Sequence, residues 1–214
     1  MKIKPKKILV FILVTSILNI GCAQNKTIVE GTSEAIGKDL DLEAVAVLFG
    51  EAQNLEDFEK ELNNPETKIS NLDLNNDGAV DYLRVVDTTK DNIHYITIQA
   101  AVAKNTFQDV AVINVKKDDT GNTKVVITGN VKIYGPDYII IPAYTTSPVI
   151  VTWFWSPLYT PWVSPYYYRY YPTYFRPWPT YSTARYRTTV RTHVNVRTAT
   201  FRGPYTTRRV RVRH

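Results

Sequence analysis

Hydrophobic positions near the start of the predicted domain repeat at intervals of three and four. Leu42, Val45, Leu48 and Phe49 form one run, and a second run follows before Pro65. This spacing predicts two helices that are broken near residue 50. Small and branched apolar residues fill the positions between, so the first helix is expected to be buried on most sides.

From residue 69 onward the hydrophobic period changes to two. The alternation of His94, Ile96 and Ile98 with polar neighbours is typical of a strand with one buried and one wet face. Short polar gaps separate the expected strands over 80–86, 93–102, 107–115 and 124–133, which predicts antiparallel neighbours. The fold class is therefore α+β, with N-terminal helices packed on an antiparallel β-meander of four to five strands. An irregular tail rich in aromatic residues, proline and arginine is expected to follow.

Charge divides the 214 residues into two parts. All twenty acidic residues lie at or before Asp137, and eleven arginines follow it, so residues 23–137 carry −9 and residues 138–214 carry +11. This separation predicts an acidic body and a basic arm. The expected units are an export signal (1–22), a polar linker (23–38), an acidic α+β domain (39–137), an uncharged aromatic and proline segment (138–168) and a basic tail (169–214).

The first 22 residues have the features of an export signal. Four lysines before residue 8 precede a mostly apolar run over residues 8–20, and small residues follow. A run of this length is too short to cross a bilayer as a helix, but it suits the apolar region of a secretory signal. We therefore expect the protein to be exported, to the outer membrane or the periplasmic face.

Two cleavage positions fit this leader. Ile20-Gly21-Cys22 resembles the end of a bacterial lipobox, which implies a lipid anchor on Cys22, the only cysteine of the chain. The alternative is ordinary cleavage after Ala23, which leaves Gln24 as the new N-terminus. The sequence leaves both open.

One loop has metal-ligand spacing. Residues 73–81 resemble the D-x-N-x-D-G-x-x-D calcium loop of EF-hand-like and dockerin-like modules. In that pattern, side chains at loop positions one, three, five and nine and the backbone carbonyl of position seven converge on the cation. The resemblance implies a Ca²⁺ cofactor held by Asp73, Asn75, Asp77, Ala79 and Asp81.

The loop departs from the EF-hand pattern at position twelve, where Arg84 stands in place of the bidentate glutamate. A strand is also expected after it, where an EF-hand has a helix. A second interpretation is that Asn76-Asp77-Gly78 forms a hairpin turn whose acids cap backbone amides. Calcium site and turn therefore stand as alternatives.

Aromatic residues and proline concentrate in the last third of the chain. Thirteen of fifteen Tyr, all four Trp and ten of twelve Pro lie from residue 134 onward. Proline interrupts segment 138–168 every few residues, so no membrane-spanning helix is expected there. Its amphipathic rings are typical of an interface with membrane headgroups or with a partner, and packing on the body is the alternative. The expected interface aromatics are Trp153, Trp155, Trp162, Tyr166, Tyr167 and Tyr168.

The basic tail over residues 169–214 is expected to be largely disordered or extended, because its composition is low in complexity and broken by proline. Arginine interleaved with aromatic rings suits polyanions. The expected partners are an anionic membrane surface, lipopolysaccharide or a wall polymer, or an envelope protein; export argues against nucleic acid. Docking on the acidic body is the alternative. The expected polyanion-binding residues are Arg169, Arg176, Arg185, Arg187, Arg191, Arg197, Arg208, Arg209, Arg211 and Arg213.

The sequence contains no enzyme constellation: its three histidines are not at metal-ligand spacing, and it has neither a phosphate-binding loop nor a nucleophile elbow. We expect a non-enzymatic cell-envelope protein whose basic aromatic tail associates with anionic surfaces or polymers. The alternative is a calcium-dependent extracytoplasmic binding module for glycan or protein. The leader, the calcium-loop match and the tail together resemble uncharacterised secreted or lipid-anchored proteins of Gram-negative envelopes, a resemblance that implies no activity.

Overall fold

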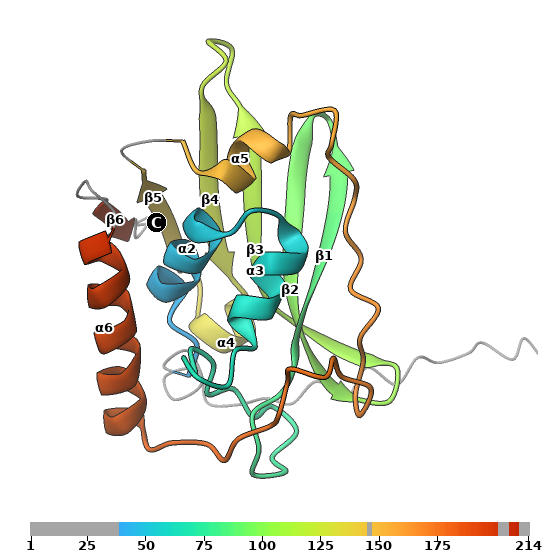
Figure 1. Ribbon diagram of the computed structural model, residues 1–214, viewed down its shortest axis with the longest axis vertical. Helices are drawn as coiled ribbons and strands as arrows, with labels where there is room; N and C mark the ends of the chain where they lie inside the picture. Colours follow the sequence, from blue (N-terminus) through green and yellow to red (C-terminus); the bar gives the residue numbers. More distant parts are fainter. Residues whose placement is uncertain (1–38, 145–146, 201–205, 210–214) are drawn as a thin grey trace, which may run out of the picture.

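The computed structural model describes residues 39–144, 147–200 and 206–209. The leader, the linker and Cys22 lie outside these residues. The strands form one antiparallel sheet whose order follows the chain, and helices lie across one face of it (Figure 1), which confirms the α+β class. The strands are β1 (Leu83–Lys90), β2 (Ile93–Ala103), β3 (Thr106–Lys117), β4 (Thr123–Gly129), β5 (Ile139–Ala143) and β6 (Thr206–Arg209). The helices are α2 (Leu42–Glu51), α3 (Leu55–Leu62), α4 (Val131–Tyr134), α5 (Val149–Trp153) and α6 (Thr183–Thr200).

The two expected N-terminal helices form where the hydrophobic pattern places them. Asp41 caps α2 by accepting a hydrogen bond from the amide of Glu43, and Asn54 caps α3 in the same way. Most of α2 is buried, as its nearly uniform apolar character predicts. The rings of Phe49 and Phe58 meet edge to face at 5.4 Å between centroids and join the two helices.

The sheet buries one face under these helices. In β2, His94, Ile96 and Ile98 are buried, while the residues between them are partly exposed. The alternation in the sequence therefore identified the face that packs on the core. Hairpins join β1 to β2, β2 to β3 and β3 to β4, so the neighbours in the sheet are also neighbours in the chain.

One strand ends earlier than expected. The strand predicted over 124–133 ends at Gly129, and the helix α4 follows, capped by the side chain of Asn130. The ring of Tyr134 folds back onto Gly129 so closely that a Cβ there would lie 2.6 Å from a ring carbon. A residue without a side chain is therefore needed at this close approach, and period-two hydrophobicity alone does not reveal it.

The segment between α5 and α6 covers the free edge of β1. The carbonyl of Trp162 accepts a hydrogen bond of 2.7 Å from the amide of Asp87, and the amide of Ser164 donates one of 3.0 Å to the carbonyl of Val85. Figure 1 shows this segment, in orange, descending beside β1 and passing beneath the body to α6. The edge that the sheet would otherwise leave unpaired is thereby protected.

Part of the basic tail differs from the expected extended or disordered state, because residues 183–200 form α6. Tyr186 and Val190, four residues apart, are 1% and 2% exposed and belong to the core. This spacing places both side chains on one helix face. The low-complexity composition of the tail, on which the expectation rested, does not reveal this pair of apolar positions.

Candidate functional site

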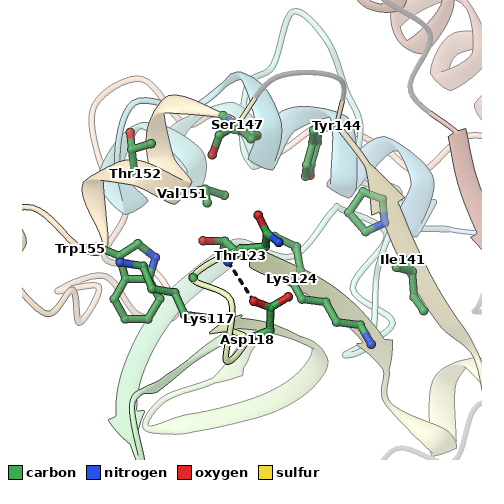
Figure 2. Close-up of a pocket in the computed structure, with 15 residues that line it drawn as sticks. Lys117, Asp118, Thr123, Lys124, Ile141, Tyr144, Ser147, Val151, Thr152 and Trp155 are labelled. Atoms are coloured by element: carbon green, nitrogen blue, oxygen red, sulfur yellow. Dashed lines mark hydrogen bonds between the residues drawn. The ribbon is translucent and has the colours of Figure 1, made fainter.

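An open groove of about 710 Å³ lies between the β3–β4 turn, β5 and α5 (Figure 2). Its size is within the range of about 300–1,000 Å³ that is typical of ligand sites. Side chains from all three elements line it, and they include Lys117, Lys124, Pro142, Tyr144, Val151 and Trp155. This groove is the candidate site that the described residues form.

The rim of the groove is cationic. Lys116, Lys117 and Lys124 are exposed, and Lys116 lies directly opposite Lys124 in the β3–β4 ladder. Like charges in directly opposed positions destabilise a sheet, so this pair is a cost that an anionic partner would relieve. Two acids, Asp118 and the exposed Asp119, follow Lys117 in the turn. The Asp118 carboxylate already accepts hydrogen bonds from Thr120 and Asn122 within the turn. These contacts, chiefly the Thr120 hydroxyl, lower the pKa of Asp118.

The two aromatic rings of the groove are held by protein contacts. The ammonium group of Lys117 lies 4.7 Å from the ring centroid of Trp155, and His94 meets the same ring edge to face. The hydroxyl of Tyr144 donates a hydrogen bond of 2.9 Å to the carbonyl of Ala46. Figure 2 shows Trp155 and Tyr144 on opposite sides of the groove. Both rings therefore form its walls, and Lys117 covers one face of Trp155.

The predicted calcium loop is a tightly hydrogen-bonded turn. Asp73 accepts hydrogen bonds from the amides of Asp77 and Gly78, at 3.1 and 2.9 Å. Asn75 accepts one from Asp77, and Asp77 accepts one from Ala79. Asn76 and Gly78 have positive φ angles of 57° and 86°, as the sharp turn requires. The side chains at loop positions one, three and five thus cap amides of their own loop.

The remaining acid of the loop is buried. Asp81 is 4% exposed and accepts a hydrogen bond of 2.6 Å from the amide of Leu74. Burial and, to a smaller extent, the charges of Asp73 and Asp77 raise the pKa of Asp81 to about 7. Among the described residues, no three His, Cys, Asp or Glu side chains are placed to hold a metal ion. The expected ligand set also includes the Asn75 side chain and the Ala79 carbonyl, and calcium binding by this loop stays a prediction.

Arg84, at loop position twelve, has another role. Its guanidinium donates a hydrogen bond of 3.0 Å to the carbonyl of Ser164 and lies 4.1 Å from the ring centroid of Phe107. The residue that breaks the EF-hand pattern therefore binds the aromatic segment to β1. This contact joins two parts of the chain that are 80 residues apart.

Most of the expected interface aromatics contact the body. Trp162 donates its indole N–H to Glu59, and Tyr166 packs edge to face on the buried Tyr82. Trp153 is partly buried against the core. Tyr167 differs, because it is 42% exposed and stacks on Tyr170 at 4.8 Å between centroids. Trp155 lines the groove, and Tyr168 is partly buried in a small cluster around Tyr82.

Glu59 on α3 is the centre of the contact between body and aromatic segment. Its carboxylate accepts hydrogen bonds from the Tyr82 hydroxyl at 2.6 Å, the Ser164 hydroxyl at 2.7 Å, the Val85 amide at 2.8 Å and the Trp162 indole at 2.9 Å. Burial raises the pKa of Glu59, and the four donors oppose that shift. Every donor favours the ionised carboxylate, and the four hydrogen bonds join α3 to β1 and to the aromatic segment.

A second buried polar cluster joins β1, β2 and the aromatic segment. The hydroxyl of Tyr159 donates a hydrogen bond of 2.6 Å to Asp87, and Nδ1 of His94 lies 3.5 Å from the same carboxylate oxygen. Rings of Phe154, Trp155 and Tyr159 surround His94 within 5.0 Å. Sequence spacing gave no signal for this cluster, because its members meet only in the folded sheet.

The described arginines of α6 point away from the body. Arg185, Arg187 and Arg191 are exposed, and Arg185 lies over the ring of Tyr181 at 4.1 Å. In the part of the chain that the structure describes, Arg187 and Arg191 form no ion pair with a carboxylate. Arg169 and Arg176 are also exposed, in the segment before α6. The described part of the structure does not include the side chains of Arg197, Arg208 and Arg209, or any atom of Arg211 and Arg213.

Within the residues described, no helix combines the length and apolar character needed to cross a membrane. Comparisons with models of protein families, with curated proteins and with solved structures gave no match. The groove itself was missed by the sequence analysis, apart from Trp155. The sequence features that could have indicated the groove are Lys117 and Lys124 on either side of a turn, and Pro142 in the next strand.

Proposed function

We propose that this chain is an exported, non-enzymatic protein of the cell envelope that binds anionic surfaces or polymers through its C-terminal helix. The observation that carries the proposal is the division of α6 into two faces. Tyr186 and Val190 attach the helix to the core, and Arg185, Arg187 and Arg191 are directed to solvent. A helix held in this way presents its guanidinium groups on a fixed surface.

The contacts that attach α6 to the core do not neutralise the charge of its arginines. The hydroxyl of Tyr186 donates a hydrogen bond of 2.8 Å to the carbonyl of Ile69 and accepts one of 2.9 Å from the amide of Asp41. The helix is thus bound to the acidic body through a tyrosine and apolar contacts. Guanidinium groups left in solvent can make bidentate contacts with phosphate or carboxylate groups. This favours a polyanion over the acidic body as their partner.

The test is co-sedimentation with vesicles that contain anionic phospholipid and with purified lipopolysaccharide, over a range of salt concentrations. The variant Arg185→Gln/Arg187→Gln/Arg191→Gln should lose most of the binding, and wild-type binding should weaken steeply with salt. The matched control is Lys90→Gln/Lys104→Gln/Lys132→Gln, which removes three exposed charges elsewhere on the body. Equal losses in the two triple variants would show that net charge alone, and not α6, determines binding.

Location is tested on the full chain. In cells grown with labelled fatty acid, the wild-type protein should incorporate the label, and Cys22→Ala should not, if the leader is processed as a lipoprotein signal. A mature mass that begins at Gln24 would instead establish ordinary cleavage. Recovery of the unprocessed chain in the cytoplasm would contradict the proposed export.

A further inference from the structure

The β4–β5 ladder is short. Pairing is limited to Ile127 with Ile140 and Thr128 with Ile139, while β4 continues its pairing with β3 as far as Thr123. Beyond Ile140, the pairs of β5 lie on its other side, with β6. The first residues of β4, 123–126, therefore have a partner strand on one side only among the described residues, and the groove lies on the other side.

The directions of the backbone groups follow from the hydrogen bonds at the two ends of β4. Gly129 donates to the carbonyl of Tyr138 on the β5 side, and Asp118 donates to the carbonyl of Asn122 on the β3 side. In an antiparallel strand these directions alternate from residue to residue. The N–H and C=O groups of Thr123 and Val125 consequently face the groove, and those of Lys124 and Val126 face β3.

Proline explains why the ladder stops. The register that pairs Ile127 with Ile140 would pair Val125 with residue 142, which is Pro142. Proline has no N–H, so it cannot donate to the Val125 carbonyl. Proline in a sheet is confined to positions where its missing donor faces no partner strand. Pro142, which lines the groove, therefore prevents β4 and β5 from pairing at this point.

Two features decide what this groove can hold. Unpaired N–H and C=O groups in a row are a template for an added strand. The exposed lysines on its rim favour negative charge, and Lys117 already covers the ring of Trp155, on which a sugar would have to stack. A peptide strand with acidic side chains satisfies both the backbone groups and the lysines, whereas a saccharide satisfies only the lysines.

We propose that the groove binds an extended acidic peptide segment of a partner protein, which adds as a strand to the open edge of β4 at Thr123 and Val125. Lys117 lies opposite Thr123 and Lys124 is the next residue along β4, so the two lysines are on opposite faces of the sheet. Each contacts acidic side chains on its own face of the added strand. The site is separate from the arginine face of α6. Its function therefore does not depend on polyanion binding by the tail, and either can fail alone.

The probe is the seven-residue peptide Glu-Glu-Val-Glu-Glu-Val-Glu, blocked at both ends and added to the full mature chain. This order places glutamate on both faces of an extended strand. Amide hydrogen exchange is followed by NMR. In the free protein, the amides of Thr123 and Val125 should exchange faster than those of Lys124 and Val126, which serve as internal references. At a peptide concentration ten times its Kd, exchange at Val125 should slow by roughly tenfold, because only the unbound fraction exchanges.

Three controls separate strand addition from simple charge attraction. The same peptide N-methylated at every residue keeps every charge but cannot pair through either edge, and it should not protect Val125. Lys117→Gln/Lys124→Gln should weaken binding of the unmethylated peptide roughly three- to tenfold, the scale of two exposed ion pairs. Lys90→Gln/Lys132→Gln should leave it unchanged. Pro142→Thr restores a donor opposite Val125 and should protect that amide without peptide.

Three results would overturn the proposal. Protection of Val125 equal to that of Val126 in the free wild type would show that the edge is closed. Equal binding of the N-methylated peptide would show attraction by charge alone. Absence of binding at millimolar peptide would exclude an acidic strand as the occupant. Loss of vesicle binding on removing the α6 arginines, with peptide binding intact, would leave this proposal standing.

Discussion

The indole N–H of Trp162 donates a hydrogen bond of 2.9 Å to the carboxylate of Glu59, which lies 103 residues earlier in the chain. Three further donors meet the same carboxylate: the hydroxyl of Tyr82, just before β1, the amide of Val85 in β1, and the hydroxyl of Ser164 in the aromatic segment. A single buried acid on α3 therefore fixes the position of the segment that covers the sheet edge. The aromatic segment around Trp162 and Ser164 is therefore part of the folded body.

We expect Glu59→Ala to lower the free energy of unfolding by roughly 3 kcal/mol or more, because four buried donors lose their acceptor and each unsatisfied group costs about 1–3 kcal/mol. Glu59→Gln should cost less than Glu59→Ala, since one oxygen remains. Urea unfolding followed by circular dichroism measures both. The control is Glu56→Gln on the exposed side of α3, and a loss in that variant as large as in Glu59→Gln would contradict a specific role for this acid.

A second prediction concerns the attachment of α6. Tyr186→Phe keeps the buried ring but removes the hydroxyl that bonds Ile69 and Asp41. The buried carbonyl of Ile69 and the partly buried amide of Asp41 then lack their partner, which should cost about 1–3 kcal/mol. Limited trypsin digestion should cut at Arg187 and Arg191 faster than in wild type. Tyr170→Phe, at a half-exposed tyrosine, is the control, and unchanged cleavage in Tyr186→Phe would show that the hydroxyl does not hold the helix.

The sequence carried the information for the helices and the meander, because both depend on local periodicity. Residues such as Leu42 and Ile96 lie on the buried faces that their spacing predicts. The early end of β4 at Gly129 depends on contact with the ring of Tyr134, and the helix α6 depends on a core position for Tyr186. Those contacts exist only after folding, and periodicity does not encode them.

The same distinction applies to the candidate sites. The calcium-loop residues were identified by spacing, and they do form one compact turn. The groove instead requires that the turn after Lys117, the proline at 142 and the residues after α5 meet in space. Composition pointed to the aromatic tail, but it could not show that Trp162 is used internally.

The loop at Asp73 yields a prediction on metal. Its side chain caps two amides, so Asp73→Ala should lower the stability of a chelated sample by about 1–2 kcal/mol. If these carboxylates act only as caps, millimolar Ca²⁺ should leave the Tm of wild type unchanged. Asp119→Ala in the exposed β3–β4 turn is the control. A Ca²⁺-dependent rise in Tm that Asp73→Ala abolishes would establish the calcium site instead.

The buried carboxyl of Asp81 predicts how stability depends on pH. Its pKa is about 7 in the folded protein, raised mainly by burial, against an ordinary value of 3.8. Between these values the folded state binds the proton more strongly, so the stability from this group is fully present below about pH 4 and is lost as pH rises through 7. Asp81→Asn keeps an acceptor for the Leu74 amide but cannot titrate. Thermal unfolding between pH 5 and 8 should therefore show wild type losing stability with rising pH, by an amount on the order of a few kcal/mol, and Asp81→Asn losing markedly less. Parallel curves for the two proteins would mean that Asp81 does not titrate in this range.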